Sequence, residues 1–187
     1  MLVSDVTTDR LTVAVREYLK NFATPEYPNS DARHIVNGFL NDVSLPSDGN
    51  EIAVFTPRAM YRHGTTLEGN VSDDGTVRLG EYVEVEVQVD CYSASRYYAQ
   101  QRAQTYEMVG RSSYGVAHFK KYGLDLLYVD DAQNLTSIMD SDQYVSRWMV
   151  TLHIGLKKAV VLQQDGFSAV SISADEIQNV DVKFPPK

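Results

Sequence analysis

Three carboxylates on one predicted strand are the residues of this chain best suited to chemistry. Glu84, Glu86 and Asp90 occur in the run EYVEVEVQVDCYS, where a period of two places them on one strand face. Carboxylate oxygens are preferred ligands of hard divalent cations, so a metal-dependent enzyme is one hypothesis. The sequence fixes no fourth ligand, and solvent-facing strands are commonly charged. We therefore favour a wet, polar strand face over a metal site.

The remaining reactive residue types form no catalytic pattern. Four histidines, His34, His63, His118 and His153, have no metal-ligand spacing, and the single cysteine excludes a Cys-based zinc cluster. We expect His34 and His63 in solvated loops and His153 in a cross-strand pair on the polar face of a strand. Cys91 lies on the apolar phase of its strand, which predicts a buried structural thiol. We therefore predict no catalytic residue, no cofactor and no metal ion.

Composition narrows the class of protein. The 187 residues fit one domain, residues 1–187, and 43% are apolar, which is ordinary for a globular protein. A net charge of −8 disfavours a dedicated nucleic-acid-binding role. No apolar run reaches the roughly 18 residues of a membrane span. The start MLVSDVTTDR lacks signal-peptide features, so we expect the chain to stay in the cytoplasm where it is made.

The first half of the chain predicts one helix and the start of a sheet. The helix is capped by Thr7 or Thr8 and stops before Pro25, since its apolar residues recur at helical spacing. Residues 31–50 fit a helical turn or an irregular strand equally well. A strand begins at EIAVFT and extends toward Tyr61. The polar, Gly-rich run GTTLEGNVSDDGTVRLG predicts a long hairpin loop, held loosely in an isolated domain.

The second half alternates strands with one helix. The strand through residues 83–91 leads into a helix capped by Ser93 or Ser95, which runs to about Val109 and ends at Gly110. Further strands are predicted over residues 124–129, in RWMVTLHIGLKKAVVL, in FSAVSISA and in the ending VDVKFPPK. The expected fold class is α+β, with a mainly antiparallel sheet and about two helices packed on one face.

Several segments, taken in order, resemble those of phage tail terminator (neck) proteins. They are EYVEVEVQVDCYS followed by a helix with Arg96, Tyr98, Ala99 and Ala103; GFLNDVSLP before EIAVFTP; RHGTT at 62–66; and DSDQYVSRWMVTLHI with QQDGFSAVSISADEIQNVDVKFPP. The resemblance spans most of residues 5–187. It implies a structural virion protein without catalytic residues, which caps the tail tube as a ring, typically a hexamer. The implied fold is a sheet with helices on one side and a long mobile hairpin.

The resemblance also implies partners. These are further copies of the chain, the tail-tube protein and a head-side connector, with DNA passing through the ring without specific binding and no membrane contact. The implied location is the virion neck, assembled in the host cytoplasm. Arg58, Arg62 and His63 are the candidate contact residues, against the alternative that they are ordinary loop charges. Competing hypotheses are a head-completion or tube protein, the metal-dependent enzyme above, and an adaptor for a cellular protein.

Overall fold

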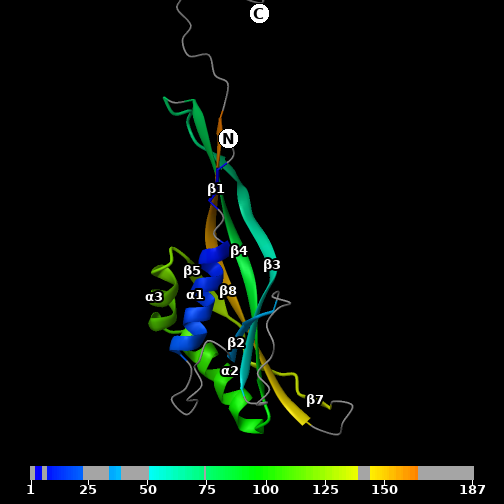
Figure 1. The fold of residues 1–187 in the computed structure, drawn as a ribbon. Coiled ribbons are helices and arrows are strands. Elements are labelled where there is room, and N and C mark those ends of the chain that lie inside the picture. Colours follow the sequence, from blue (N-terminus) through cyan, green and yellow to red (C-terminus); the bar gives the residue numbers. More distant parts are fainter. Residues whose placement is uncertain are drawn as a thin grey trace, which may run out of the picture.

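The computed structural model describes residues 3–5, 8–22, 34–38, 51–73, 75–138 and 144–163. Three long strands dominate it, and three helices lie to one side of them (Figure 1). The elements are β1 (Val3–Asp5), α1 (Thr8–Asn21), β2 (Ile35–Asn37), β3 (Ile52–Glu68), β4 (Thr76–Ser93), α2 (Arg96–Gly110), α3 (Ser113–Lys120), β5 (Asp125–Val129), β6 (Gln133–Asn134), β7 (Ser137–Ile138) and β8 (Tyr144–Gln163).

The strands form one sheet whose main order is β1-β8-β4-β3-β2. Strand β8 pairs with β4 along one edge, and its other edge pairs in turn with β7, β6, β5 and β1. The pairing of β2 with β3 is parallel, while the other described pairs are antiparallel. The predicted α+β class with a mainly antiparallel sheet is therefore confirmed.

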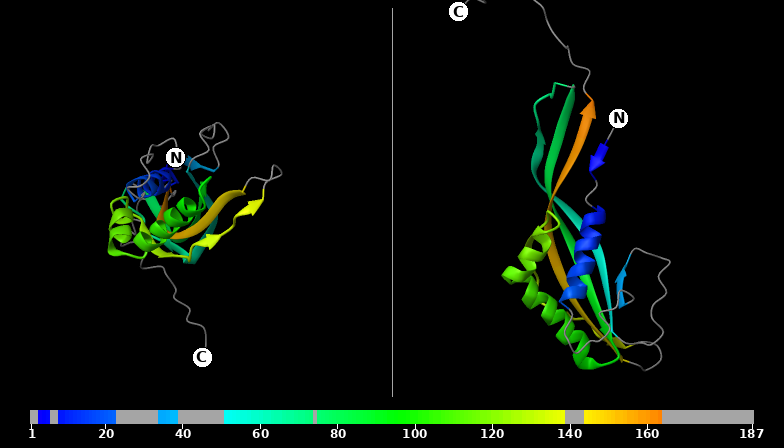
Figure 2. Two further views of the ribbon diagram at one scale, coloured as in Figure 1. Left: turned by 90° about the horizontal axis from the view of Figure 1, so that it is seen from below. Right: turned by 60° about the vertical axis from the view of Figure 1, so that its left-hand side comes forward.

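The core forms between the helices and one face of the sheet (Figure 2). The odd-numbered residues of β4 from Val83 to Cys91 and the even-numbered ones of β8 from Val150 to Leu156 are buried there, as their alternation predicts. Helix α1 buries Leu11, Val15, Tyr18 and Leu19 against this layer. Burial of these apolar side chains supplies the main favourable term in folding.

The predicted helices are confirmed at their main boundaries. Helix α1 begins at Thr8 and ends at Asn21, before Pro25, and α2 ends at Gly110. Ser95 occupies the N-cap position of α2, but its side chain makes no capping hydrogen bond. The Ser93 hydroxyl instead accepts a bond from the Ser95 amide, 3.0 Å away.

The sequence pattern does not predict helix α3. In this region it predicts only the strand over residues 124–129. The helix is eight residues long, and its N-cap Ser112 accepts a bond from the Tyr114 amide. Helix α3 begins only two residues after the end of α2, and Gly115 of α3 lies against the backbone of α2. Tertiary packing of Phe119 and His118 stabilises a segment too short for a strong periodic pattern.

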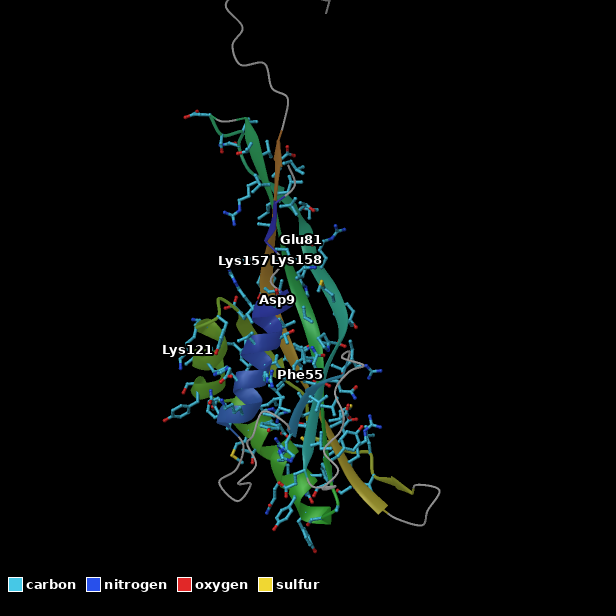
Figure 3. All side chains as sticks on the ribbon, in the orientation of Figure 1. Asp9, Phe55, Glu81, Lys121, Lys157 and Lys158 are labelled. Atoms are coloured by element: carbon cyan, nitrogen blue, oxygen red, sulfur yellow. The ribbon has the colours of Figure 1, made fainter. Side chains whose placement is uncertain are left out.

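The predicted long hairpin is present, but its loop is shorter than expected, because strands occupy both ends of the segment. Strand β3 continues to Glu68 and β4 starts at Thr76, and both remain paired beyond the helices. We call residues 64–80 the arm; β8 accompanies it as far as Gln163 (Figure 1). Strand pairing is made by backbone groups, so the Gly-rich, polar composition does not prevent it. Where the sheet leaves the helices, it carries Glu81, Lys157 and Lys158 (Figure 3).

Other predictions meet mixed outcomes. Residues 35–37 form a strand, which resolves part of the ambiguous 31–50 region. His34 precedes this strand and is buried, so its predicted loop solvation is wrong. The strands predicted in FSAVSISA and VDVKFPPK lie outside the described residues.

Candidate functional site: the helix-free face of the sheet

The sheet face opposite the helices is polar, and the predicted acidic row lies on it. The even-numbered residues of β4 from Tyr82 to Tyr92 share this face with the odd-numbered residues of β8. The expectation that it is wet is wrong for Glu84, Gln88 and Asp90, which are buried. Their neighbours on β3, β5 and β8 cover them, because paired strands place side chains of one row side by side.

Glu84 is the centre of a cluster drawn from four strands. Its two carboxylate oxygens lie 2.8 Å from His63 Nε2 and 2.7 Å from His153 Nδ1. The Tyr128 hydroxyl donates to Glu84 Oε1 at 3.1 Å, and the Tyr128 ring stacks on His153 with centroids 3.8 Å apart. His153 Nε2 lies 3.3 Å from a carboxylate oxygen of Asp130. The cluster thus ties β3, β4 and β8 to β5.

The environment of Glu84 changes its acidity. Burial alone raises the pKa of this carboxyl, but hydrogen bonds from His153, His63 and Tyr128 stabilise the charged form and together hold the pKa below its ordinary value of 4.5. A carboxylate with a depressed pKa stabilises the fold above its ordinary pKa. That contribution is lost as the pH falls through the lowered value.

This linkage gives a testable expectation for Glu84→Gln. Near neutral pH the substitution should lower the free energy of unfolding by about 2 kcal/mol, because it weakens charge-assisted hydrogen bonds. The difference from the parent chain should shrink as the pH falls below the ordinary value of 4.5. Urea denaturation at stepped pH measures it. Glu68→Gln, on the exposed arm, is the matched control and should show no such trend. A constant difference across the pH range would contradict the linkage.

The rest of the acidic row is occupied by other partners. Asp90 accepts from Arg147 at 3.0 Å and from the Gln88 amide at 2.5 Å. Glu86 lies beside Tyr61 and raises the pKa of its phenol. Within the described ranges, no group of three or more His, Cys, Asp or Glu side chains is arranged to hold a metal ion.

The three candidate contact residues all lie on β3, which continues past the strand end predicted near Tyr61 and so includes Arg62 and His63. Arg58 donates to Gln88 Oε1 at 2.5 Å, and His63 pairs with Glu84. Arg62 is exposed and stands opposite Val83 in register, so it falls on the other face of the sheet from His63. The structure therefore brings Arg58 and His63 to the polar face and places Arg62 on the opposite face.

Cys91 and His118 are structural. Cys91 is buried at 0% exposure, and burial raises the pKa of its thiol to about 12, which confirms the predicted buried thiol. His118 is also buried, and its Nε2 lies 2.9 Å from the Ala14 carbonyl oxygen. A thiol that stays protonated at neutral pH is a poor nucleophile.

Sequence reading missed Tyr128 and Asp130 as members of the polar face. Tyr128 falls in the strand predicted over residues 124–129, and Asp130 lies directly after it. Both join the cluster because β5 pairs with β8 and has a register irregularity between Leu126 and Tyr128. Such a bulge turns a side chain to a face that simple alternation does not predict.

Comparison with known proteins identifies the family. A family model described as phage neck terminator protein matches residues 9–185 of the 187. No curated protein shows a significant match to the chain. Among the described helices, none combines the length and apolar character needed to cross a lipid bilayer. Since the family match covers nearly the whole chain, the protein belongs to the phage neck terminator family and is a structural component of the phage tail and neck.

Proposed function

We propose that this chain caps the completed tail tube as a ring of identical copies. The ring stops tube polymerisation and presents its other side to the head connector. Membership of the neck terminator family carries the proposal. The family is structural, and we accordingly propose that the chain is not an enzyme and acts as one domain in the assembled virion.

The shape of the sheet supports a role in assembly. The arm extends β3 and β4 beyond the helices (Figure 2), and Leu67 and Val71 on it are 73% and 54% exposed. Exposed apolar side chains at the end of an extension favour contact with another protein. Arg58, Arg62 and His63, just before the arm, are proposed to contribute to subunit or tube contacts.

A ring also fits the charge of the chain. Subunits that repeat one heterologous contact close into a finite assembly when the rotation between them closes. We propose a hexamer, with DNA passing through its channel without specific binding. The net charge of −8 supports passage without adhesion, because an acidic subunit repels phosphates. Assembly takes place in the host cytoplasm.

The test is negative-stain imaging of the purified full chain, alone and mixed with the tail-tube protein of the same phage. We expect finite rings, or tubes closed at one end, and a shorter mean tube length as the chain is titrated in. Unbounded stacks of the chain itself would identify a tube subunit. Tubes that keep their length and carry no cap at any ratio would refute the capping role.

A further inference from the structure

Two opposite edges of the sheet carry complementary surfaces. On one side, β2 pairs with β3 only over residues 53–55, and no other described strand covers the outer edge of β3. On the opposite side, β5 pairs with β8, and within the described ranges its own outer edge has no strand partner. An uncovered edge presents backbone N–H and C=O groups that can pair with another strand.

The β3 edge is basic at its ends and apolar between them. Arg58 and Arg62 are exposed, and between them Met60 and Tyr61 are 50% and 49% exposed. We call residues 58–62 the basic edge. Large apolar side chains at half exposure, bracketed by charges, resemble the apolar centre and polar rim of a protein interface.

The β5 edge has the same arrangement with the opposite charge. Asp125 and Asp130 are exposed at its ends, and between them Leu127 and Tyr128 are 41% and 50% exposed. We call residues 125–130 the acidic edge. The two edges therefore match in both charge and apolar content.

The sheet register places the two edges at one height. Tyr61 pairs with Glu84, Glu84 with Gly155, and Gly155 with Asp125, so the first and last of these lie in one row across the sheet. Ala59 and Tyr128 share a second row, through Glu86 and His153. Three successive antiparallel pairings make β5 run antiparallel to β3.

The geometry points to a direct contact between copies. We propose that the basic edge of one subunit joins the acidic edge of the next, head to tail, so that β3 and the neighbouring β5 extend one sheet across the subunit boundary. A rotation about an axis parallel to the strands keeps their height and direction. It brings Asp125 of the next copy level with Tyr61, and Asp130 of that copy near Arg58 on the same face of the sheet. This inference rests on the proposed ring.

A second copy of the chain fits these two edges best. The charges of the two edges are complementary, their heights agree, and the resulting strand pair is antiparallel, the more stable kind. A contact between two different edges of one chain is heterologous, which is the type that generates rings. Arg58 and Asp130 suit a test best, because both side chains lie on the helix-free face, where Arg58 donates to Gln88 and Asp130 lies 3.3 Å from His153 Nε2.

A charge swap tests the pairing. Arg58→Glu and Asp130→Lys should each raise the apparent dissociation constant of the assembly by about tenfold or more, since each places like charges opposite one another. The double variant Arg58→Glu/Asp130→Lys should recover most of the loss. Native mass spectrometry and light scattering of the full chain, with and without tube protein, measure it. Lys20→Glu on α1 is the matched charge reversal and should leave assembly unchanged, and melting temperatures check folding.

Cross-linking tests the direction of the contact. Cys91 is the one native cysteine and is buried, so introduced cysteines can be cross-linked selectively. A short bismaleimide should convert Met60→Cys/Leu127→Cys into a ladder that ends at the ring size. A mixture of Met60→Cys and Leu127→Cys chains should stop at dimers across this contact. A ladder from either single variant, or none from the double variant in assembled rings, would overturn the contact.

The outcomes separate this contact from the proposed function. Rings that form normally with Arg58→Glu and Asp130→Lys, and that do not cross-link through the two edges, would overturn the contact and leave tube capping intact. A parent chain that remains monomeric both alone and with tube protein would overturn the contact and the ring together.

Discussion

Replacing Gly115 with alanine should destabilise the protein by about 2 kcal/mol, although alanine is the better helix former. An added Cβ would lie 2.6 Å from the Val109 carbonyl oxygen and 2.9 Å from Gly110 Cα, both in the backbone of α2. Backbone cannot rotate aside as a side chain can, so α3 would have to move. Overpacking of this kind costs up to about 3 kcal/mol. The helix-propensity gain of about 1 kcal/mol offsets only part of it.

Thermal and urea unfolding measure this effect, and we expect the melting temperature to fall by about 6 °C for a chain of this size. Val116→Ala is the matched control, because Val116 is exposed on the same helix and alanine there meets no packing change. The control should change stability by less than about 0.5 kcal/mol. A Gly115→Ala chain as stable as its parent would show that α2 and α3 are not packed at this distance.

Gly115→Ala should also affect the proposed contact between subunits. Helix α3 packs against β5 as well as against α2. A displaced α3 would move the acidic edge, residues 125–130, relative to the rest of the sheet. If subunits join through this edge, Gly115→Ala should weaken ring assembly more than its loss of stability alone explains, whereas Val116→Ala should assemble as the parent does.

Removing a single hydroxyl, in Tyr106→Phe, should cost about 3 kcal/mol. The Tyr106 hydroxyl donates to the Leu19 carbonyl oxygen at 2.9 Å and accepts from Arg102 Nε at 2.8 Å. Tyr106 and Arg102 are 0% and 2% exposed, so water cannot replace the lost bonds. Leaving a buried donor or acceptor unsatisfied costs roughly 1–3 kcal/mol, and more for a charged group.

A double-mutant cycle tests the cause of that loss. Arg102→Met removes the buried charge, so the pair Arg102→Met/Tyr106→Phe should be more stable than the sum of the two single changes predicts. Tyr97→Phe is the matched control, because Tyr97 is 68% exposed on the same helix. We expect urea denaturation to show no significant change for the control. Strictly additive effects would mean that the hydroxyl and the guanidinium are not energetically coupled.

This network also explains how α1 and α2 are fastened together. The Tyr18 hydroxyl on α1 donates to the Tyr106 carbonyl oxygen of α2 at 2.6 Å, and the Tyr106 hydroxyl donates in return to the Leu19 carbonyl oxygen of α1. Burial raises the pKa of both phenols, which keeps them protonated as donors at neutral pH. The chain contains 12 tyrosines, and these two serve the core.

The sequence by itself determined the strongly periodic parts of this protein. Alternation from Val83 to Cys91 and from Trp148 to Leu156 identified the central strands and their helix-facing sides, because a period of two leaves one face apolar. The helical spacing of apolar residues identified α1 and α2. Several sequence segments, taken in order along the chain, indicated the phage neck terminator family. Each of these signals lies in neighbouring residues or in the order of segments along the chain. None of them depends on a contact between residues far apart in sequence.

Only the tertiary structure decided how the polar positions are used. Glu84 reads as a wet carboxylate in sequence, yet it lies between His63 and His153, which are 21 and 69 residues away. Both ends of the arm are strand because β3, β4 and β8 pair there, and not because of their composition. The matching heights of residues 58–62 and 125–130 follow from three successive strand registers. Register joins segments far apart along the chain, and pairing by backbone groups leaves little trace in side-chain composition.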